Sequence, residues 1–210
     1  MKTDAELAAS ALRGSQDAYR ELVKRFERPV YSLVLRMVQD AATAEDLAQE
    51  VFVKAFRRLD TYDPRWKLSS WLFKIAHNAT IDHLRRGVPE TVPLESGKDD
   101  ERGSLAAVLA DEATENPQAA AERRDLARSL ERAIGRLRPE YRQAVLMFYV
   151  HGASYQEICE VTGQPLGTVK TNLHRAKKEL AQTMTGFGWG PAGGTPGVAA
   201  ADETGRAPAS

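Results

Sequence analysis

Residues 154–180, SYQEICEVTGQPLGTVKTNLHRAKKEL, decide how the second half of this chain folds. Ser154 followed three residues later by Glu157 is a capping-box pattern, which predicts a helix start because each residue satisfies a free backbone donor of the other. Gly163 stands where that helix must end, since glycine tolerates a positive φ. Pro165 suits the start of a second helix. The stretch therefore predicts two helices joined by a tight turn, a helix-turn-helix.

The second predicted helix has an apolar face and a basic face. Apolar residues recur every three or four positions, which indicates one buried stripe; it comprises Leu166, Val169, Leu173, Ala176 and Leu180. The opposite face holds Lys170, Thr171, His174, Arg175, Lys177 and Lys178. Residues 163–180 contain four Lys or Arg against one acid. This layout is typical of a DNA recognition helix, and an ordinary amphipathic helix with a solvated basic face is the alternative.

The composition of the whole chain excludes several classes of protein. Its 210 residues suit one or two small domains, and 29 basic residues balance 29 acidic ones, so DNA binding would depend on local segregation of charge. A single cysteine, Cys159, excludes an internal disulfide and a cysteine-rich zinc site. No apolar run is long enough to cross a bilayer, and the N-terminus lacks a signal-peptide core. We expect a cytoplasmic protein without membrane insertion.

Shifts in composition divide the chain into four parts. Residues 1–87 and 123–184 show helical periodicity without strand-like alternation. Residues 88–122 hold nine acids against two bases and few large apolar side chains, which predicts a flexible acidic linker, although SLAAVLADEA within it is compatible with a short helix. Residues 185–210 are rich in Gly, Ala and Pro, which predicts a disordered tail. The expected fold class is all-α, with two small helical domains.

The stretch TAEDLAQEVFVKAFRRLDTYDP, residues 43–64, predicts a long helix with Thr43 as its cap. Its expected buried stripe comprises Leu47, Val51, Phe52, Ala55, Phe56 and Leu59. The other face is polar apart from one valine; it comprises Asp46, Gln49, Glu50, Val53 and Arg57. Taken alone, that face is most simply a solvated surface.

The next stretch, RWKLSSWLFKIAHNATIDHLRR, mixes cations with aromatic residues. Ser69 or Ser70 is expected to cap its helix, and residues 64–87 hold five Lys or Arg against one acid. An outer stripe of this helix comprises Lys74, Asn78, Asp82 and Arg85. Such a segment suits an unpaired nucleic acid strand, because cations follow the phosphates and exposed bases stack on aromatic rings. The alternative is that Trp66 and Trp71 are core residues.

Three segments together resemble an extracytoplasmic-function (group IV) RNA polymerase sigma factor of the sigma-70 family. They are YSLVLRMVQDAATAEDLAQEVFVKAFRRLDTYDP, SSWLFKIAHNATIDHLRR and LRPEYRQAVLMFYVHGASYQEICEVTGQPLGTVKTNLHRAKKEL. The resemblance covers roughly residues 18–86 and 124–184, and the strings AEDLAQEVF and GTVKTNLHRAKKEL are specific in combination. The chain departs from the family pattern at Leu68, near which a phenylalanine is common, and at His174, where an aromatic or basic residue is often found.

The resemblance implies a bacterial transcription initiation factor rather than an enzyme. It would bind core RNA polymerase, at the β′ clamp helices and the β flap, and direct it to promoters by recognising −35 and −10 elements and helping to melt the DNA. Residues 1–87 would be sigma region 2, and residues 123–184 would be region 4. The resemblance further implies an alternative sigma factor for a stress or envelope response, regulated by an anti-sigma factor, without a cofactor or metal.

The resemblance also implies three sets of contact residues. Core polymerase would be bound by Asp46, Gln49, Glu50 and Val53. The −10 element would be contacted by Trp66, Lys67, Ser69, Trp71, Lys74, Asn78, Asp82 and Arg85. The −35 element would be contacted by Thr168, Lys170, Thr171, His174, Arg175, Lys177 and Lys178. Asn78 is the expected base contact, because an amide both donates and accepts hydrogen bonds.

Three other classes of protein remain to be weighed. A helix-turn-helix regulator that binds duplex DNA without polymerase explains the second half and leaves the first half without a role. A pure interaction protein leaves both basic segments unexplained. An enzyme is disfavoured, since the chain has no Gly-rich phosphate loop and no nucleophile elbow, and His77 and His83 fall on different faces of one predicted helix.

Overall fold

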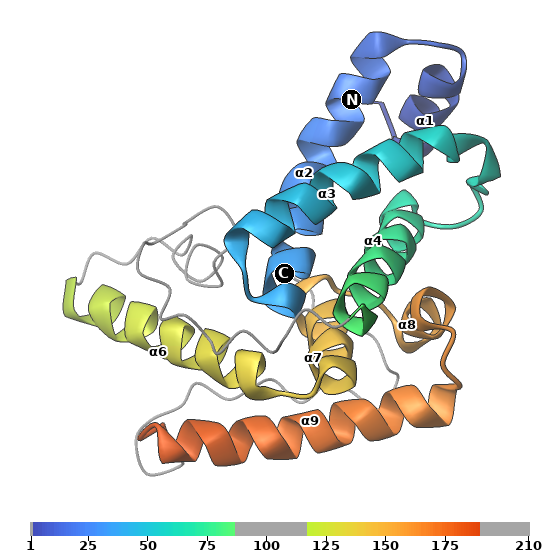
Figure 1. The fold of residues 1–210 in the computed structure, drawn as a ribbon. Coiled ribbons are helices and arrows are strands. Elements are labelled where there is room, and N and C mark those ends of the chain that lie inside the picture. Colours follow the sequence, from blue (N-terminus) through green and yellow to red (C-terminus); the bar gives the residue numbers. More distant parts are fainter. Residues whose placement is uncertain (1, 87–116, 190–210) are drawn as a thin grey trace. The chain divides into compact units, whose positions relative to one another are not determined.

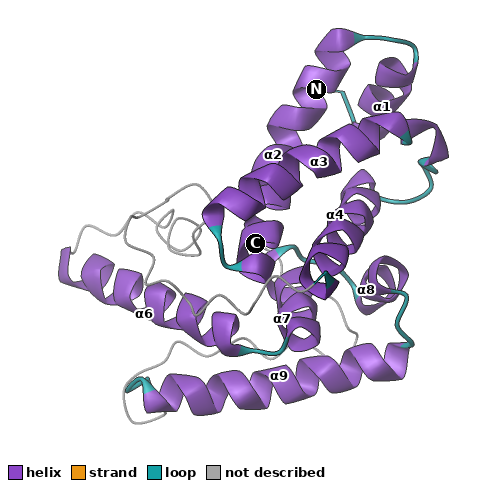
Figure 2. Ribbon diagram, viewed as in Figure 1, coloured by secondary structure: helices purple, strands orange, loops and turns teal. Residues whose placement is uncertain are grey.

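The computed structural model describes residues 2–86 and 117–189. The chain forms two compact units, divided between these two ranges. Every regular element within the described residues is helical, and neither range contains a strand (Figure 2). None of these helices combines the length and the hydropathy that a membrane span requires. The all-α fold class is therefore confirmed.

The first unit consists of four α-helices and one short 3-10 turn (Figure 1). Their bounds are α1 (Asp4–Leu12), α2 (Gln16–Val38), α3 (Ala41–Arg57), η1 (Leu59–Thr61) and α4 (Leu68–Arg85). Helices α2, α3 and α4 pack against one another in pairs, and α1 packs on α2. The fully buried centre of this bundle comprises Val30, Val34, Ala44, Val51 and Ala76.

Two of the predicted helix caps in this unit are wrong. Helix α3 is capped by Asp40, whose carboxylate accepts the Thr43 backbone N–H at 2.8 Å, so the helix begins before Thr43. Helix α4 begins at Leu68, with Lys67 at its N-cap and no side-chain cap, and Ser69 and Ser70 lie inside its first turn. The packing of Leu68, which is buried, sets this start.

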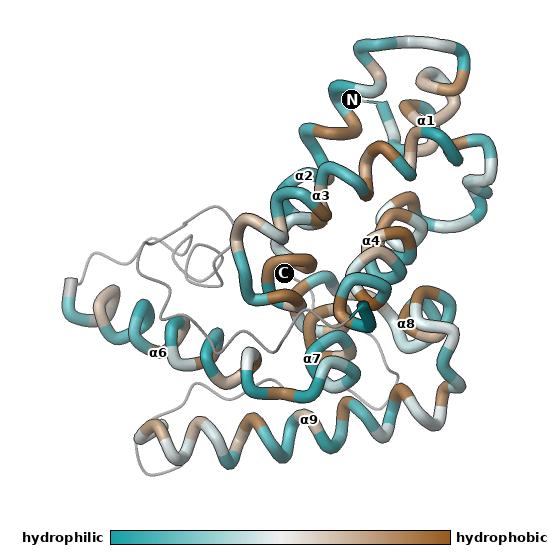
Figure 3. Tube along the Cα trace, in the orientation of Figure 1, coloured by the Kyte–Doolittle hydropathy of each residue, from teal (hydrophilic) through white to brown (hydrophobic). Residues whose placement is uncertain are grey.

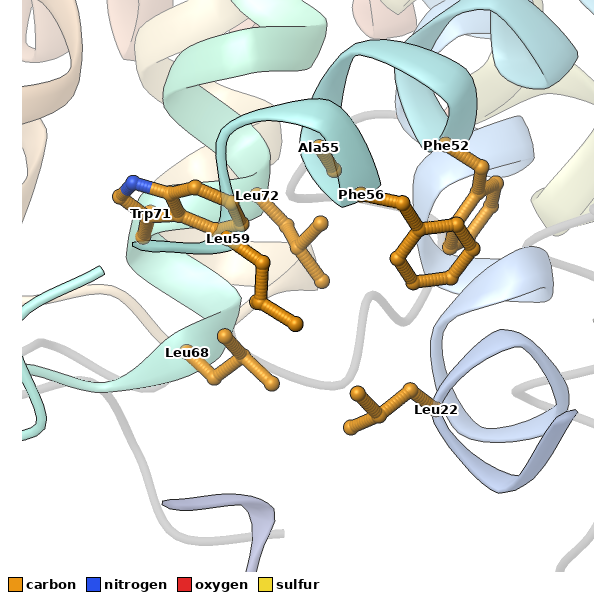
Figure 4. Close-up of a pocket in the computed structure, with 8 residues that line it drawn as sticks. All are labelled: Leu22, Phe52, Ala55, Phe56, Leu59, Leu68, Trp71 and Leu72. Carbon is orange, nitrogen blue, oxygen red and sulfur yellow. The ribbon is translucent and has the colours of Figure 1, made fainter. Parts of the chain in front are cut away.

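A small apolar pocket lies between α2, α3 and α4, as Figure 4 shows. Its lining comprises Leu22, Phe52, Ala55, Phe56, Leu59, Leu68, Trp71 and Leu72. Phe52 and Phe56, which were predicted to be buried, are half-buried at its edge. Phe56 meets the ring of Tyr19 edge to face, with the ring centroids 4.7 Å apart. The pocket belongs to the hydrophobic core that fixes α4 against α3.

The second unit is also helical. Its elements are α6 (Pro117–Arg136), α7 (Pro139–Val145), the π-helical turn η2 (Leu146–Val150), α8 (Tyr155–Thr162) and α9 (Leu166–Gly186). In Figure 3 hydrophobic positions recur along α9 from turn to turn, as expected for a helix with one buried face. The fully buried side chains of this unit include Leu146, Met147, Phe148, Ile158 and Val169. Helix α9 packs on α6, α7 and α8 and so organises the whole unit.

Both ends of the second unit extend beyond the predicted boundaries. Helix α6 begins at Pro117, inside the range 88–122 assigned to the linker, and α9 continues to Gly186. Phe187 then lies against α6, with the guanidinium carbons of Arg132 and Arg136 each 4.9 Å from its ring centroid. The first five residues of the expected tail thus belong to the described structure. The segment SLAAVLADEA and residues 190–210 lie outside the described residues.

Candidate nucleic-acid and polymerase interfaces

The predicted helix-turn-helix is present at residues 154–180, with its expected caps. The Ser154 hydroxyl accepts the Glu157 backbone N–H at 3.2 Å, and the Glu157 carboxylate accepts the Ser154 N–H at 2.8 Å. Gly163 ends α8 in the left-handed region, at φ 71°, and donates to the Cys159 carbonyl at 2.8 Å. Pro165 immediately precedes α9, so the turn between the helices is fixed by local chemistry.

A buried amide ties this turn to the second helix. Asn172, a residue of α9, has a buried side chain that donates its amide hydrogen to the Gln164 side-chain oxygen at 3.1 Å. The backbone N–H of Gln164 donates in turn to the Thr162 hydroxyl at 3.3 Å. Sequence reasoning missed Asn172, because the sequence gives no sign that its partner is Gln164, eight residues earlier. The bond connects the turn to α9.

The seven residues predicted for the −35 element all lie on the exposed face of α9: Thr168, Lys170, Thr171, His174, Arg175, Lys177 and Lys178. The Thr171 hydroxyl donates to the Gly167 carbonyl at 2.8 Å, so its oxygen points outward as an acceptor. The ammonium of Lys170 lies 5.8 Å from the ring centroid of Tyr155, which holds one cation at the side of the helix. The face combines donors, acceptors and positive charge.

Leu166 was predicted to belong to the buried stripe of α9, and this prediction is wrong. Its side chain is 44% exposed. The buried stripe begins one turn later, at Val169, and continues through Leu173 and Ala176. Leu166 stands at the first position of the helix, beyond the surface that the neighbouring helices cover. The exposed end of α9 therefore presents an apolar side chain beside its polar ones.

A cationic groove lies beside the exposed face of α9. Arg138 and Tyr141 line it from the start of α7, and α9 contributes Arg175, Lys178, Glu179 and Gln182. Three cations against one carboxylate make this groove suitable for a phosphate. Sequence reasoning missed Arg138 and Tyr141, because they precede the helix-turn-helix and come next to α9 only in the folded unit.

The loop before α4 is held by its own hydrogen bonds. The Tyr62 hydroxyl donates to the Trp66 carbonyl at 2.9 Å, and the Trp66 N–H donates to the Asp63 carbonyl at 3.0 Å. Arg65 pairs with the Asp63 carboxylate and lowers the pKa of that carboxyl below its ordinary value. The Trp66 side chain is 51% exposed, whereas Trp71 is half-buried against Tyr62. Of the two rings, Trp66 is the more exposed.

The outer stripe predicted for α4 is solvent-accessible. Lys74, Asn78, Asp82 and Arg85 are exposed, as is Lys67, and Ser69 is half-buried. On the inner side, burial lowers the pKa of His77 to about 4, and nearby Arg85 contributes to the same shift. His77 is therefore neutral near pH 7, and the charge of this surface comes from its lysines and arginines.

The polar face predicted for α3 is likewise exposed: Asp46, Gln49, Glu50 and Val53. The Val53 side chain is 49% exposed in the middle of charged neighbours. Glu50 forms an ion pair with Lys54 at 2.6 Å. An exposed valine among charged and amide side chains is compatible with a solvated surface and also with the apolar centre of a protein interface. Within residues 2–86 and 117–189, no group of three potential ligand side chains can hold a metal ion.

Comparison with known proteins connects these surfaces to one family. The family model of sigma-70 region 2 matches residues 22–88, and that of sigma-70 region 4 matches residues 127–180. The chain is 32% identical to the ECF RNA polymerase sigma factor SigW of Bacillus subtilis over 173 residues, which cover 82% of this chain and 91% of the relative. The chain belongs to the extracytoplasmic-function (ECF) sigma factors of the sigma-70 family.

Further comparisons agree with this membership. The sigma factor is 30% identical over 182 residues to the ECF RNA polymerase sigma-E factor of Escherichia coli K12, covering 85% of this chain and 92% of that relative. Its fold resembles the sigma factor RpoE solved in complex with the anti-sigma factor NepR from Bartonella quintana, with a TM-score of 0.60 and 19% identity over 80% of this chain and 96% of that one. The resemblance in structure shows the fold.

Membership of this family establishes the class of function. The sigma factor is a transcription initiation factor that acts with core RNA polymerase on promoter DNA, and it is not an enzyme. Among the described residues, the region 2 match lies within the first unit and the region 4 match lies within the second unit.

Proposed function

We propose that the two units of this sigma factor divide promoter recognition between them. The first unit docks on core polymerase and takes the −10 element, and the second unit takes the −35 element. The observation that carries this proposal is the segregation of side chains on α9, where one face is buried and the opposite face holds all seven of the expected contact residues. The cations there face outward, although the whole chain is neutral.

Core docking is assigned to the face of α3 formed by Asp46, Gln49, Glu50 and Val53. The two carboxylates supply charge for a basic partner surface, and the half-exposed Val53 supplies an apolar centre. Hydrophobic centres with polar rims are typical of protein interfaces. In this proposal the β′ clamp helices of polymerase cover this face, and the second unit contacts the β flap.

The −10 element is assigned to the loop and helix that follow. The exposed ring of Trp66 offers a stacking surface, and Asn78 on α4 offers both a donor and an acceptor to a base edge. The remaining contacts comprise Lys67, Ser69, Trp71, Lys74, Asp82 and Arg85, with Trp71 acting mainly through the packing of the loop. Capture of an unpaired base at this surface offsets the cost of unstacking it.

The −35 element is assigned to α9, inserted in the major groove of duplex DNA. Thr171 and His174 lie at its outward centre and face the base edges, while Arg175, Lys177 and Lys178 reach the phosphates. The groove lined by Arg138 and Tyr141 continues this surface and adds a cation and a hydroxyl for a further phosphate. Lys170 and Thr168 complete the set.

Regulation by an anti-sigma factor is proposed by analogy. A sigma factor with a similar fold is bound by the anti-sigma factor NepR in its solved structure. An alternative sigma factor for a stress or envelope response that is held in this way would act in the cytoplasm, where polymerase and promoters are found. Purification of the sigma factor from its native host would then recover an inhibitory partner whose release restores transcription.

Run-off transcription with purified core polymerase and a library of upstream DNA fragments tests the assignment of docking and DNA contacts. New start sites that require the sigma factor define its promoter motif. Asp46→Lys with Gln49→Lys is expected to abolish them, because it reverses the charge of the docking face. Asp17→Lys is the matched control, since Asp17 is a highly exposed acid on α2 outside that face.

The variants His174→Ala and Arg175→Ala test the second unit. His174→Ala is expected to reduce transcription from a promoter with both elements about tenfold or more, as for one lost base contact, and to change little on a promoter whose −35 element is scrambled. Arg175→Ala, which removes a phosphate contact, is expected to weaken both promoters to a similar extent. Specific binding of duplex DNA by the free protein, with no gain of start sites by core, would instead favour a polymerase-independent regulator.

A further inference from the structure

We infer that Gly167 marks the point where promoter DNA comes closest to the backbone of α9, and that its missing side chain sets how deeply this helix enters the major groove. The inference rests on the proposed role of α9. Gly167 is then a specificity-determining position, and its neighbours in the sequence are the exposed, apolar Leu166 and the polar Thr168.

Gly167 lies on the outward face of α9. Residues three or four apart share a face of an α-helix, so Gly167 heads the stripe that continues with Thr171, His174 and Lys178. These three followers are exposed, and the stripe runs opposite to the buried Val169 and Leu173. Gly167 is therefore at the outward centre of the first turn of α9.

Among the residues that the structure describes, nothing accounts for a glycine at this position. A Cβ built on Gly167 meets none of their atoms within 4 Å outside the local helix backbone. Gly167 is helical and its φ is not positive, in contrast to that of Gly163 in the preceding turn. Glycine is a poorer helix former than alanine, so it is unfavourable for the folded protein here. Glycine in such a place indicates close approach by something outside the chain.

The charge of α9 identifies what approaches as DNA. The helix contains four Lys or Arg and a single acid, Glu179, which lies in the groove beside Arg138. In helix-turn-helix proteins the N-terminal residues of the second helix contact base edges, and Gly167 is the second residue of α9. The Thr171 hydroxyl donates a hydrogen bond to the Gly167 carbonyl. This bond holds the hydroxyl, one turn further along α9, close to the space left open by the missing side chain of Gly167.

The test pairs Gly167 with a second glycine of the same helix. Gly186 also lies in α9, at its far end, and a Cβ there likewise meets nothing within 4 Å. We would measure two quantities for Gly167→Ala, Gly167→Leu and the control Gly186→Ala. One is the thermal midpoint of the full chain. The other is the affinity of the reconstituted holoenzyme for its promoter, with an intact or a scrambled −35 element.

Opposite effects on stability and binding are expected at Gly167. The midpoint of Gly167→Ala stays the same or rises by up to about 4 °C, because alanine favours the helix. Its affinity for the intact promoter falls about tenfold, the size of one lost base contact. Gly167→Leu reduces binding to that of the scrambled promoter. Gly186→Ala binds like the parent protein, because no DNA reaches that end.

Two results would overturn the inference. Parental affinity in both Gly167 variants means that no close approach occurs, and a lowered midpoint in Gly167→Ala means that glycine serves the fold. The His174→Ala variant separates this outcome from failure of the proposed function. If it loses dependence on the −35 element while Gly167→Ala does not, only the inference about Gly167 falls. If neither variant loses it, the assignment of α9 to DNA falls as well.

Discussion

Replacement of Arg142 tests how the second unit is held together. The Arg142 side chain is 8% exposed and donates to three carbonyls at the end of α6: Ile134 at 3.2 Å, Gly135 at 2.5 Å and Leu137 at 3.0 Å. Ile134 and Gly135 lie in the last turn of α6 and Leu137 directly follows it, and the Ile134 carbonyl also accepts the Leu137 backbone N–H at 3.1 Å. Burial lowers the pKa of Arg142 to about 10, so the guanidinium remains charged at neutral pH. One cation thus caps a helix from inside the core.

The expected cost of Arg142→Met follows from these contacts. Methionine keeps the apolar stem and removes the hydrogen bonds of the guanidinium, at about 1–3 kcal/mol for each buried carbonyl that loses its partner. Removing a buried charge recovers part of its desolvation cost, so the net loss is about 3 kcal/mol. For a unit of this size that lowers the thermal midpoint by about 12–24 °C. The thermal midpoint of Arg142→Lys is expected to lie between those of the parent protein and Arg142→Met, since an ammonium lacks the planar fork of donors.

Circular dichroism and calorimetry on the full chain would measure this loss, with Arg128→Met as the matched control. Arg128 lies on the exposed side of α6 and pairs with Asp125 at 3.7 Å, so its replacement is expected to change stability by about 0.5 kcal/mol or less. If Arg142→Met unfolds at the same temperature as Arg128→Met, the buried guanidinium does not hold the end of α6, and the reasoning is refuted.

Two further perturbations test other parts of the structure. The folded pKa of His77 is about 4 against an ordinary 6.5, so the unfolded chain binds the proton at a higher pH than the folded chain does. The free energy of unfolding is therefore highest above pH 6.5 and falls progressively toward pH 4, by up to about 3 kcal/mol. Urea unfolding from pH 7.5 to 4.5 measures this slope, and His77→Gln should flatten it; an unchanged slope contradicts the assignment. Phe187→Leu keeps apolar bulk but removes the ring between Arg132 and Arg136, and is expected to cost about 1–2 kcal/mol in urea unfolding of the second unit. Parental stability in that variant would show that the two guanidiniums gain nothing from the ring.

Patterns within one or two helical turns were read correctly from the sequence. The capping box at Ser154 and Glu157, the left-handed Gly163 and the exposed polar faces of α3, α4 and α9 all match the structure. Each depends on neighbours three or four residues away, so periodicity and cap chemistry suffice to predict it. The family was inferred from the resemblance of three segments and is confirmed by the comparisons.

Helix ends in the first unit were less predictable. Asp40 rather than Thr43 caps α3, and α4 begins at Leu68 ahead of both candidate serines. Several residues near a helix start can serve as its cap, and the choice depends on which start also buries the right side chains. Leu68 settles that choice for α4 by entering the pocket shared with Leu22 and Leu59.

The sequence by itself determined that the chain is helical, that it carries a helix-turn-helix, and which faces of its helices are polar. Only the tertiary structure decided that Arg142 is buried beneath α6, that Leu166 is exposed and that Phe187 is held between two arginines. These two groups of features differ in how far apart in the sequence the interacting residues are. A helical face is set by near neighbours, whereas burial depends on which remote segments cover it, as Arg132 covers Phe187.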